Sequence, residues 1–143
     1  MKKVFLMTAL CLSLFACGNS KAEREVKQQT DTSKADVVEV LYFYGAQRCP
    51  TCRAIEEETK NVVSTAFADD VANGRLVYKA VDIGKNEALA DKYQVTWSSL
   101  VLVDHENGAE ATEDMTKFAF GNARKSPVAF RKGLADKIRE MLN

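Results

Sequence analysis

The sequence has few of the features that would mark a nucleic-acid-binding or membrane-spanning protein. It contains one histidine, His105, and four cysteines in 143 residues, and no Cys/His pairs stand at the spacing of a zinc finger. No basic patch is interleaved with aromatic residues, so the common nucleic-acid-binding modules are excluded. The longest apolar run, Val4–Phe15, is too short to span a bilayer as a helix. Without internal repeats, the length suffices for one domain and no more.

The beginning of the chain has the pattern of an export signal. Lys2 and Lys3 precede the apolar run, which leads through Ala16 to Cys17. A positive region, a short apolar region and a small residue at the cleavage point are typical of such signals. The segment resembles a bacterial lipoprotein signal, in which cleavage before Cys17 is coupled to attachment of lipid to its sulfur. An ordinary secretory signal with Cys17 nearby by chance is the alternative.

This resemblance divides the chain into three parts. Residues 1–16 are expected to be a lipoprotein signal peptide, and residues 17–36 a lipidated cysteine with a flexible tether. The tether is expected because Ser20–Ala35 is polar, charged and low in large apolar residues. Residues 37–143 are expected to form the domain. We therefore expect a lipoprotein of the cell envelope, anchored to a membrane on its periplasmic or extracytoplasmic side.

The two cysteines of the domain, Cys49 and Cys52, follow a predicted buried strand. Val37–Tyr44 is rich in β-branched and aromatic residues, as expected for a central strand covered on both faces. A short loop with one glycine then leads to Cys49-Pro50-Thr51-Cys52. Proline suits the first position of a helix, because its missing N–H would have no intrahelical partner there. The pattern predicts a helix that begins at Pro50 with Cys49 as its N-cap.

This placement favours a reactive Cys49. The N–H groups of a helix N-terminus can point at its sulfur, and Arg48 and Arg53 add positive charge nearby, so the thiolate is favoured over the thiol. We expect Cys49 to be the nucleophile and Cys52, one helical turn further, to be the less exposed resolving thiol. A pair at this spacing closes too small a loop to constrain the unfolded chain much, which indicates that it serves reactivity rather than stability.

Apolar periodicity and turn residues predict the remaining elements. Phe118 and Phe120 are expected to pack into the core from alternate positions of a strand, and His105 to be solvated in a turn. The predicted elements are a helix from Cys52 to Asp69, a strand Leu76–Ile83, a short helix Glu87–Tyr93, a strand Ser98–Val103, a less regular fourth strand over Ala109–Phe120 and a helix from Pro127 to Leu142.

The order of these elements, with the cysteine pair between the first strand and its helix, resembles the thioredoxin superfamily over about Val37–Asn143. The resemblance implies an α/β fold of thioredoxin-like type, with a central mixed four-stranded sheet flanked by helices, and Cys49 and Cys52 as the catalytic pair. The residues that carry it are Tyr42-Phe43-Tyr44, Cys49-Pro50-Thr51-Cys52, Val81-Asp82-Ile83 and Leu89–Val95.

Three positions depart from the pattern of that superfamily. Arg48 replaces a tryptophan before the first cysteine, Phe43 stands where an acid lies beneath the second, and Ser99 stands where a cis-proline faces the disulfide. A non-proline cis bond costs ~3 kcal/mol, so we expect a trans bond and a changed peptide-docking edge. Trp97, Ser98 and Ser99 are the candidate residues of the substrate groove, although packing would explain Trp97 equally well.

These residues support the hypothesis of a cell-envelope thiol–disulfide oxidoreductase that needs no cofactor and works as a monomer. Its partners would be protein thiols or disulfides and a further redox protein, with the direction of electron transfer left open. Two alternatives remain. Without proline at position 99, the two thiolates could bind copper, zinc or an iron–sulfur cluster. The domain could also be a non-catalytic adaptor that presents a groove to a partner.

Overall fold

The computed structural model describes residues 36–143. The expected signal peptide, Cys17 and nearly all of the expected tether lie outside the described residues. Within residues 36–143, no helix combines the length and the apolar character needed to cross a bilayer.

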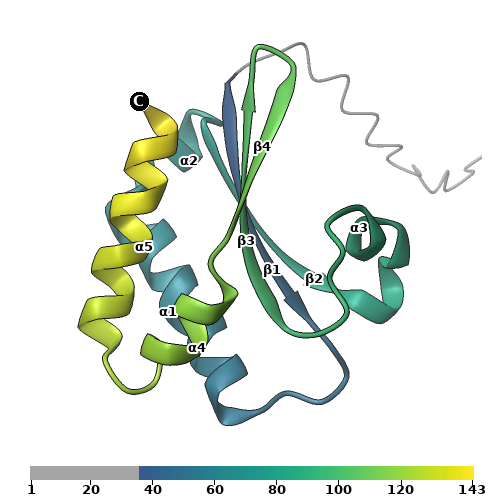
Figure 1. Cartoon of the computed structure of the whole chain (residues 1–143). Helices are drawn as coiled ribbons and strands as arrows, with labels where there is room; N and C mark the ends of the chain where they lie inside the picture. Colours follow the sequence, from purple (N-terminus) through teal and green to yellow (C-terminus); the bar gives the residue numbers. More distant parts are fainter. Residues whose placement is uncertain (1–35) are drawn as a thin grey trace, which may run out of the picture. The chain divides into compact units, whose positions relative to one another are not determined.

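A mixed four-stranded sheet forms the centre of the domain, as the sequence predicts (Figure 1). Strands β1 and β2 are parallel, and the other two neighbouring pairs are antiparallel. From Val40 to Phe43, β1 is at most 1% exposed, because both of its faces are covered. This burial explains the nearly continuous apolar run in its sequence. The strands are β1 (Val37–Tyr44), β2 (Leu76–Asp82), β3 (Ser99–Glu106) and β4 (Ala109–Asp114), in the spatial order β2-β1-β3-β4.

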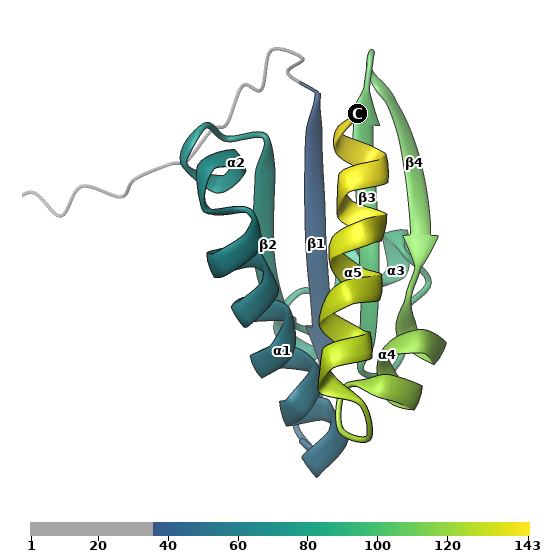
Figure 2. The same cartoon turned by 90° about the vertical axis from the view of Figure 1, so that its left-hand side faces the viewer.

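The helices cover the two faces of this sheet unequally. Helices α1, α4 and α5 lie on one face, whereas α3 lies on the other (Figures 1 and 2). All six residues of β4 are exposed, so this edge strand has little helical cover. The helices are α1 (Pro50–Ala66), α2 (Ala68–Ala72), α3 (Glu87–Lys92), α4 (Thr116–Asn122) and α5 (Pro127–Leu142), with a 3-10 turn at Ile83–Lys85 before α3.

Successive residues of β1 contribute to two separate apolar cores, because side chains alternate between the faces of a strand. Val40 and Tyr42 belong to the larger core between the sheet and helices α1 and α5. Leu41 and Phe43 belong to the smaller core beneath α3. The sheet thus fixes both layers through one central strand.

The prediction of a fourth strand over Ala109–Phe120 is wrong in its second half. Strand β4 ends at Asp114 and α4 begins at Thr116. The Asp114 carboxylate accepts a hydrogen bond from the Thr116 N–H at 2.8 Å, which turns the chain out of the strand. Residues two apart on a helix point in different directions. Phe118 and Phe120 nevertheless both pack against the larger core, so the expectation of core packing is confirmed although the strand is not.

Phe118 packs α4 against α5. Its ring stacks on Phe130 with 5.9 Å between the ring centres. It also lies over Gly133 so closely that a Cβ at that position would overlap the ring. The missing side chain of Gly133 lets the two helices approach, and this contact sets where α4 holds Phe120.

Charged side chains connect three strands on the α3 face. Glu39 on β1 lies 2.5 Å from the Lys79 Nζ on β2 and 3.1 Å from the His105 Nε2 on β3. His105 is therefore a half-buried strand residue, and the expectation of a solvated turn histidine is wrong. Burial by itself would raise the pKa of Glu39, but hydrogen bonds with Lys79 and His105 outweigh burial and hold this pKa below its usual 4.5.

We predict that Glu39 stabilises the fold at neutral pH and loses this effect in acid. A carboxylate whose folded pKa is lowered stabilises the protein above its unfolded pKa, and the effect is lost as the pH falls through the folded pKa. Glu39→Gln should lower the free energy of unfolding at neutral pH, and its difference from the wild type should shrink as the pH falls below about 4.5. Urea denaturation over this pH range measures the difference in the free energy of unfolding between the wild type and the variant. A difference that did not change with pH would contradict the prediction.

Candidate functional site: a disulfide at a helix N-terminus

The cysteine pair lies at the N-terminus of α1, just beyond the carboxyl end of β1. Cys49 is the N-cap residue, with φ −68° and ψ 159°, and Pro50 begins the helix, as the sequence predicts. The Cys49 Sγ accepts a hydrogen bond from the Cys52 N–H, with 3.0 Å between sulfur and nitrogen. The first N–H groups of a helix have no intrahelical partners and carry partial positive charge. The sulfur therefore takes the place of a capping oxygen.

Cys49 and Cys52 form a disulfide, with their Cα atoms 5.0 Å apart. The two residues differ in accessibility. Cys49 is exposed, whereas Cys52 is 5% exposed beneath the first turn of α1. Cys49 is thus the more accessible of the two to a partner thiol, an arrangement suited to an outer nucleophile and an inner resolving thiol.

Tyr42 holds the first turn of α1 from within the core. This fully buried residue of β1 donates a hydrogen bond from its hydroxyl to the Cys52 carbonyl oxygen at 2.7 Å. Burial raises the pKa of Tyr42, and the neighbouring Arg48 and Ser98 offset part of this rise. The hydroxyl thus remains a donor at neutral pH. Phe43, at the position where the superfamily has an acid, belongs to the core beneath α3 on the opposite face of the sheet.

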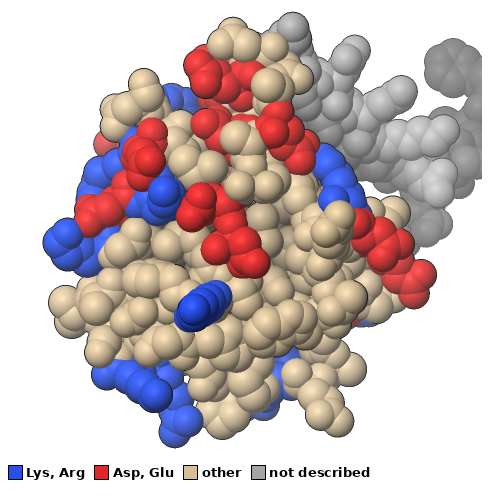
Figure 3. All heavy atoms as spheres, in the orientation of Figure 1, with Lys and Arg blue, Asp and Glu red and all other residues tan. Residues whose placement is uncertain are grey.

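The two arginines beside the pair have different surroundings. Arg48 forms an ion pair with Glu56 of α1, and its guanidinium carbon lies 4.3 Å from the centre of the Tyr44 ring. Its charge is therefore shared with a carboxylate. Arg53 is exposed on α1, and its backbone N–H donates a hydrogen bond to the Cys49 carbonyl oxygen at 3.1 Å. At the end of the molecule drawn lowest in Figure 3, Lys and Arg dominate the visible charges. Positive charge near Cys49 acts in favour of a thiolate.

A cavity of about 370 Å³ opens beside the disulfide. Trp97 and Ser98, from the loop before β3, line it together with both cysteines, and Phe120 contributes from α4. Ser99 is not among its lining residues. It is buried, and its hydroxyl donates to the Trp97 carbonyl oxygen at 3.0 Å. Two of the three groove candidates thus meet at the disulfide, and the third supports their loop.

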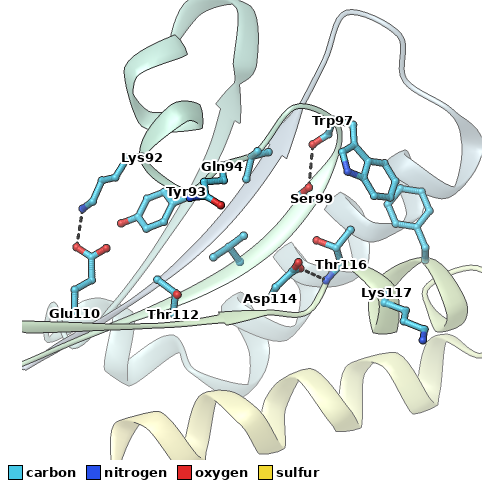
Figure 4. A pocket seen from close by; sticks show the side chains of 13 residues that line it. Lys92, Tyr93, Gln94, Trp97, Ser99, Glu110, Thr112, Asp114, Thr116 and Lys117 are labelled. Atoms are coloured by element: carbon cyan, nitrogen blue, oxygen red, sulfur yellow. Dashed lines mark hydrogen bonds and ion pairs between the residues drawn. The ribbon is translucent and has the colours of Figure 1, made fainter.

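A second cavity, of about 760 Å³, lies on the α3 face of β3 and β4 (Figure 4). Tyr93 borders it at the end of α3, and Thr112 and Asp114 border it from β4. Trp97 and Phe120 line both cavities. Their ring centres are 5.3 Å apart and the ring planes are tilted by 34°. This pair, called the aromatic ridge below, separates the disulfide cavity from the larger one.

The residues available to a metal ion are few. Within residues 36–143, no three His, Cys, Asp or Glu side chains gather in an arrangement that could hold a metal. Cys49 and Cys52 would supply two thiolates, whereas structural zinc takes four ligands. A structural zinc ion bound by this pair would therefore need two ligands besides Cys49 and Cys52.

Comparison with solved structures identifies the fold. The Trx4 domain of ERdj5 matches with a TM-score of 0.52 at 17% sequence identity, over 75% of this chain and 81% of that domain. The fold is thioredoxin-like. Weaker likenesses are found to Trxlp from Edwardsiella tarda (TM-score 0.44, 20% identity, 68% of this chain and 82% of that one). A thioredoxin from Thermus thermophilus matches with a TM-score of 0.42 at 19% identity, over 68% of this chain and 74% of that one. Neither a protein-family model nor a curated protein sequence matches this chain.

Sequence reasoning misses two residues of this thioredoxin-like site. Tyr42 lies in the apolar run of β1, and nothing in that run indicates which carbonyl its hydroxyl reaches. Phe120 is hidden by the apparent alternation with Phe118, which is typical of a strand. The signal that could have found it is Asp114 two residues before Thr116, because aspartate readily accepts a hydrogen bond from the backbone two residues on and ends a strand.

We predict that the Tyr42 hydroxyl stabilises the disulfide form. Tyr42→Phe keeps the ring and removes the donor to the Cys52 carbonyl oxygen, so the free energy of unfolding should fall by about 1 kcal/mol. Tyr78→Phe is the matched control. The Tyr78 hydroxyl is buried without a hydrogen-bond partner within residues 36–143, and its loss should leave stability unchanged or raised.

Urea denaturation of both variants with the disulfide intact provides the measurement. Equal losses of stability in the two variants would show that the hydrogen bond to Cys52 is not the source of the effect.

Proposed function

We propose that this protein is a thiol–disulfide oxidoreductase of the cell envelope, with Cys49 as nucleophile and Cys52 as resolving thiol. The observation that carries the proposal is the pairing of an exposed, helix-capping Cys49 with a buried Cys52 in one disulfide. An inert structural disulfide needs neither an exposed sulfur nor a helix N-terminus, whereas thiolate chemistry benefits from both.

The reaction is an exchange of disulfides with a partner protein. In the reducing direction, the Cys49 thiolate attacks one sulfur of the partner disulfide, and the other partner sulfur leaves as a thiolate that takes a proton from water. Cys52, after losing its proton, attacks the Cys49 sulfur of the mixed disulfide and releases the second partner thiol. The partner gains two electrons, and the protein ends with the Cys49–Cys52 disulfide. The same steps in reverse oxidise a partner dithiol.

A Cys52→Ala variant tests the order of these steps. Cys49 can still attack, but no second thiol releases the partner, so the reduced variant should accumulate a mixed disulfide with a disulfide-bonded peptide. Mass spectrometry should show the added mass, and dithiothreitol should remove it. Cys49→Ala is the matched control and should form far less of this product, because Cys52 is buried.

Other outcomes separate the alternatives. Retention of a partner by Cys52→Ala without a covalent bond would indicate an adaptor. If the wild type formed no reversible Cys49–Cys52 disulfide at any redox poise, the proposal would fail and metal analysis would follow. Equilibrium redox titration also assigns the direction. A potential near about −270 mV marks a reductase, and one above about −200 mV marks an oxidant or isomerase.

We further propose that lipid on Cys17 anchors the protein to a membrane and that it works there as a monomer. The support is the sequence pattern of residues 1–17, with its positive start, short apolar run and small residue before the cysteine. Mass spectrometry should find a lipid mass on Cys17 of the wild type. Cys17→Ala should lack this mass and, because cleavage is coupled to lipidation, should retain residues 1–16. Cys11→Ala is the matched control, because this cysteine lies within the cleaved segment. A wild type whose mature N-terminus carried no lipid would overturn the anchor, and size-exclusion chromatography with light scattering tests the monomer.

A further inference from the structure

The aromatic ridge leaves a large apolar side chain in water next to the disulfide. Trp97 is 59% exposed, although one of its faces packs on Phe120. Exposed tryptophan at the border of a cavity is a common centre of binding energy in protein interfaces, because its large ring is removed from water when a partner binds. The ridge therefore offers an apolar contact that a partner engaged at Cys49 can reach.

The larger cavity continues from the other side of this ridge. Val95 and Val101 contribute apolar side chains to its lining, and Thr112 and Thr116 contribute polar residues. It is too large to be filled by the side chain of one residue, and its mixed lining suits a polypeptide with both backbone and side-chain groups. Because Trp97 and Phe120 line both cavities, a segment bound at Cys49 can cross the ridge and extend into the larger one.

The acidic side chains of the larger cavity differ in whether they already form ion pairs. Glu110 forms an ion pair with Lys92 at 2.6 Å. Asp114 forms none of the ion pairs found among residues 36–143, and one of its oxygens accepts the Thr116 N–H. Both Asp114 and Lys117 line the cavity, but in Figure 4 the Lys117 side chain points away from the Asp114 carboxylate. Acidic side chains also gather on the upper part of the face in Figure 3. The carboxylate of Asp114 is thus available to a basic group.

We propose that the ridge and the larger cavity select the partner, a proposal that rests on the oxidoreductase function. The occupant is an extended polypeptide segment next to the reactive cysteine of the partner. An apolar side chain of this segment packs on Trp97 and Phe120, and a lysine or arginine further along binds Asp114. The preferred substrates are therefore protein disulfides flanked by apolar and basic residues, rather than small disulfides.

The test compares rate constants of the reduced full-length protein with three disulfides. The first is 2,2′-dithiodipyridine, a small uncharged reagent. The second is a disulfide peptide with leucine and lysine beside the cysteine, and the third is the same peptide with alanine and glutamate instead. The wild type should react about tenfold faster with the leucine–lysine peptide than with the alanine–glutamate peptide.

Two variants examine the two contacts separately. Trp97→Ala should lower the rate with the leucine–lysine peptide about tenfold relative to the rate with dithiodipyridine. Asp114→Asn keeps an oxygen for the Thr116 N–H and removes only the charge. This variant should lower the rate with the leucine–lysine peptide about threefold relative to the rate with dithiodipyridine. The rate with this peptide should also depend less on salt concentration than in the wild type.

Matched controls lie outside both cavities. Glu113→Gln removes a neighbouring charge of β4 that lies opposite Leu102, a residue of the core on the other face of the sheet. Val128→Ala removes an apolar side chain that is 72% exposed on α5. Both controls should leave all three rates unchanged.

The outcomes separate this proposal from the function on which it rests. Equal rates of the wild type with the two peptides, or an equal loss with peptide and dithiodipyridine in Trp97→Ala, would overturn the selection of partners and leave the oxidoreductase function standing. A wild type that reduced none of the three disulfides would overturn both.

Discussion

The hydrogen bond from the Cys52 N–H to the Cys49 sulfur joins the chemistry of this protein to its fold. It exists because α1 begins at Pro50, directly after a loop that follows the central strand β1. The burial of β1 and α1 in one core holds the helix end in place, so the sulfur faces the Cys52 N–H at the helix N-terminus. An exposed cysteine elsewhere on the surface would lack this fixed positive environment.

Beneath the disulfide, the fold uses a neutral donor where an ionised group would be costly to bury. The Tyr42 hydroxyl reaches the Cys52 carbonyl oxygen from the core, and the nearby Arg48 is held by Glu56 and the Tyr44 ring. These contacts position the first turn of α1. In the cavity beside the disulfide, Trp97 and Phe120 supply an apolar surface that a partner could contact.

Local sequence determined the elements that depend on short-range chemistry. The strand Val37–Tyr44, the helix start at Pro50 and the helix Pro127–Leu142 lie where the sequence predicts them, because apolar periodicity, N-cap preference and proline geometry act within a few residues. The cysteine pair at the junction of strand and helix was visible for the same reason. The mixed sheet was implied by the resemblance to the thioredoxin superfamily, and the structure confirms it.

Tertiary structure decided what depends on residues distant in the chain. The alternation of Phe118 and Phe120 suggested a strand, but the fit of Phe118 over Gly133 and the turn at Asp114 make it a helix. The residues around His105 predicted a turn, but His105 lies in β3 and pairs with Glu39, 66 residues away in the sequence. Trp97 meets Phe120 only because β3 and α4 come together at one end of the sheet. Sequence periodicity records which face of an element is apolar, whereas only packing determines which distant side chain that face meets.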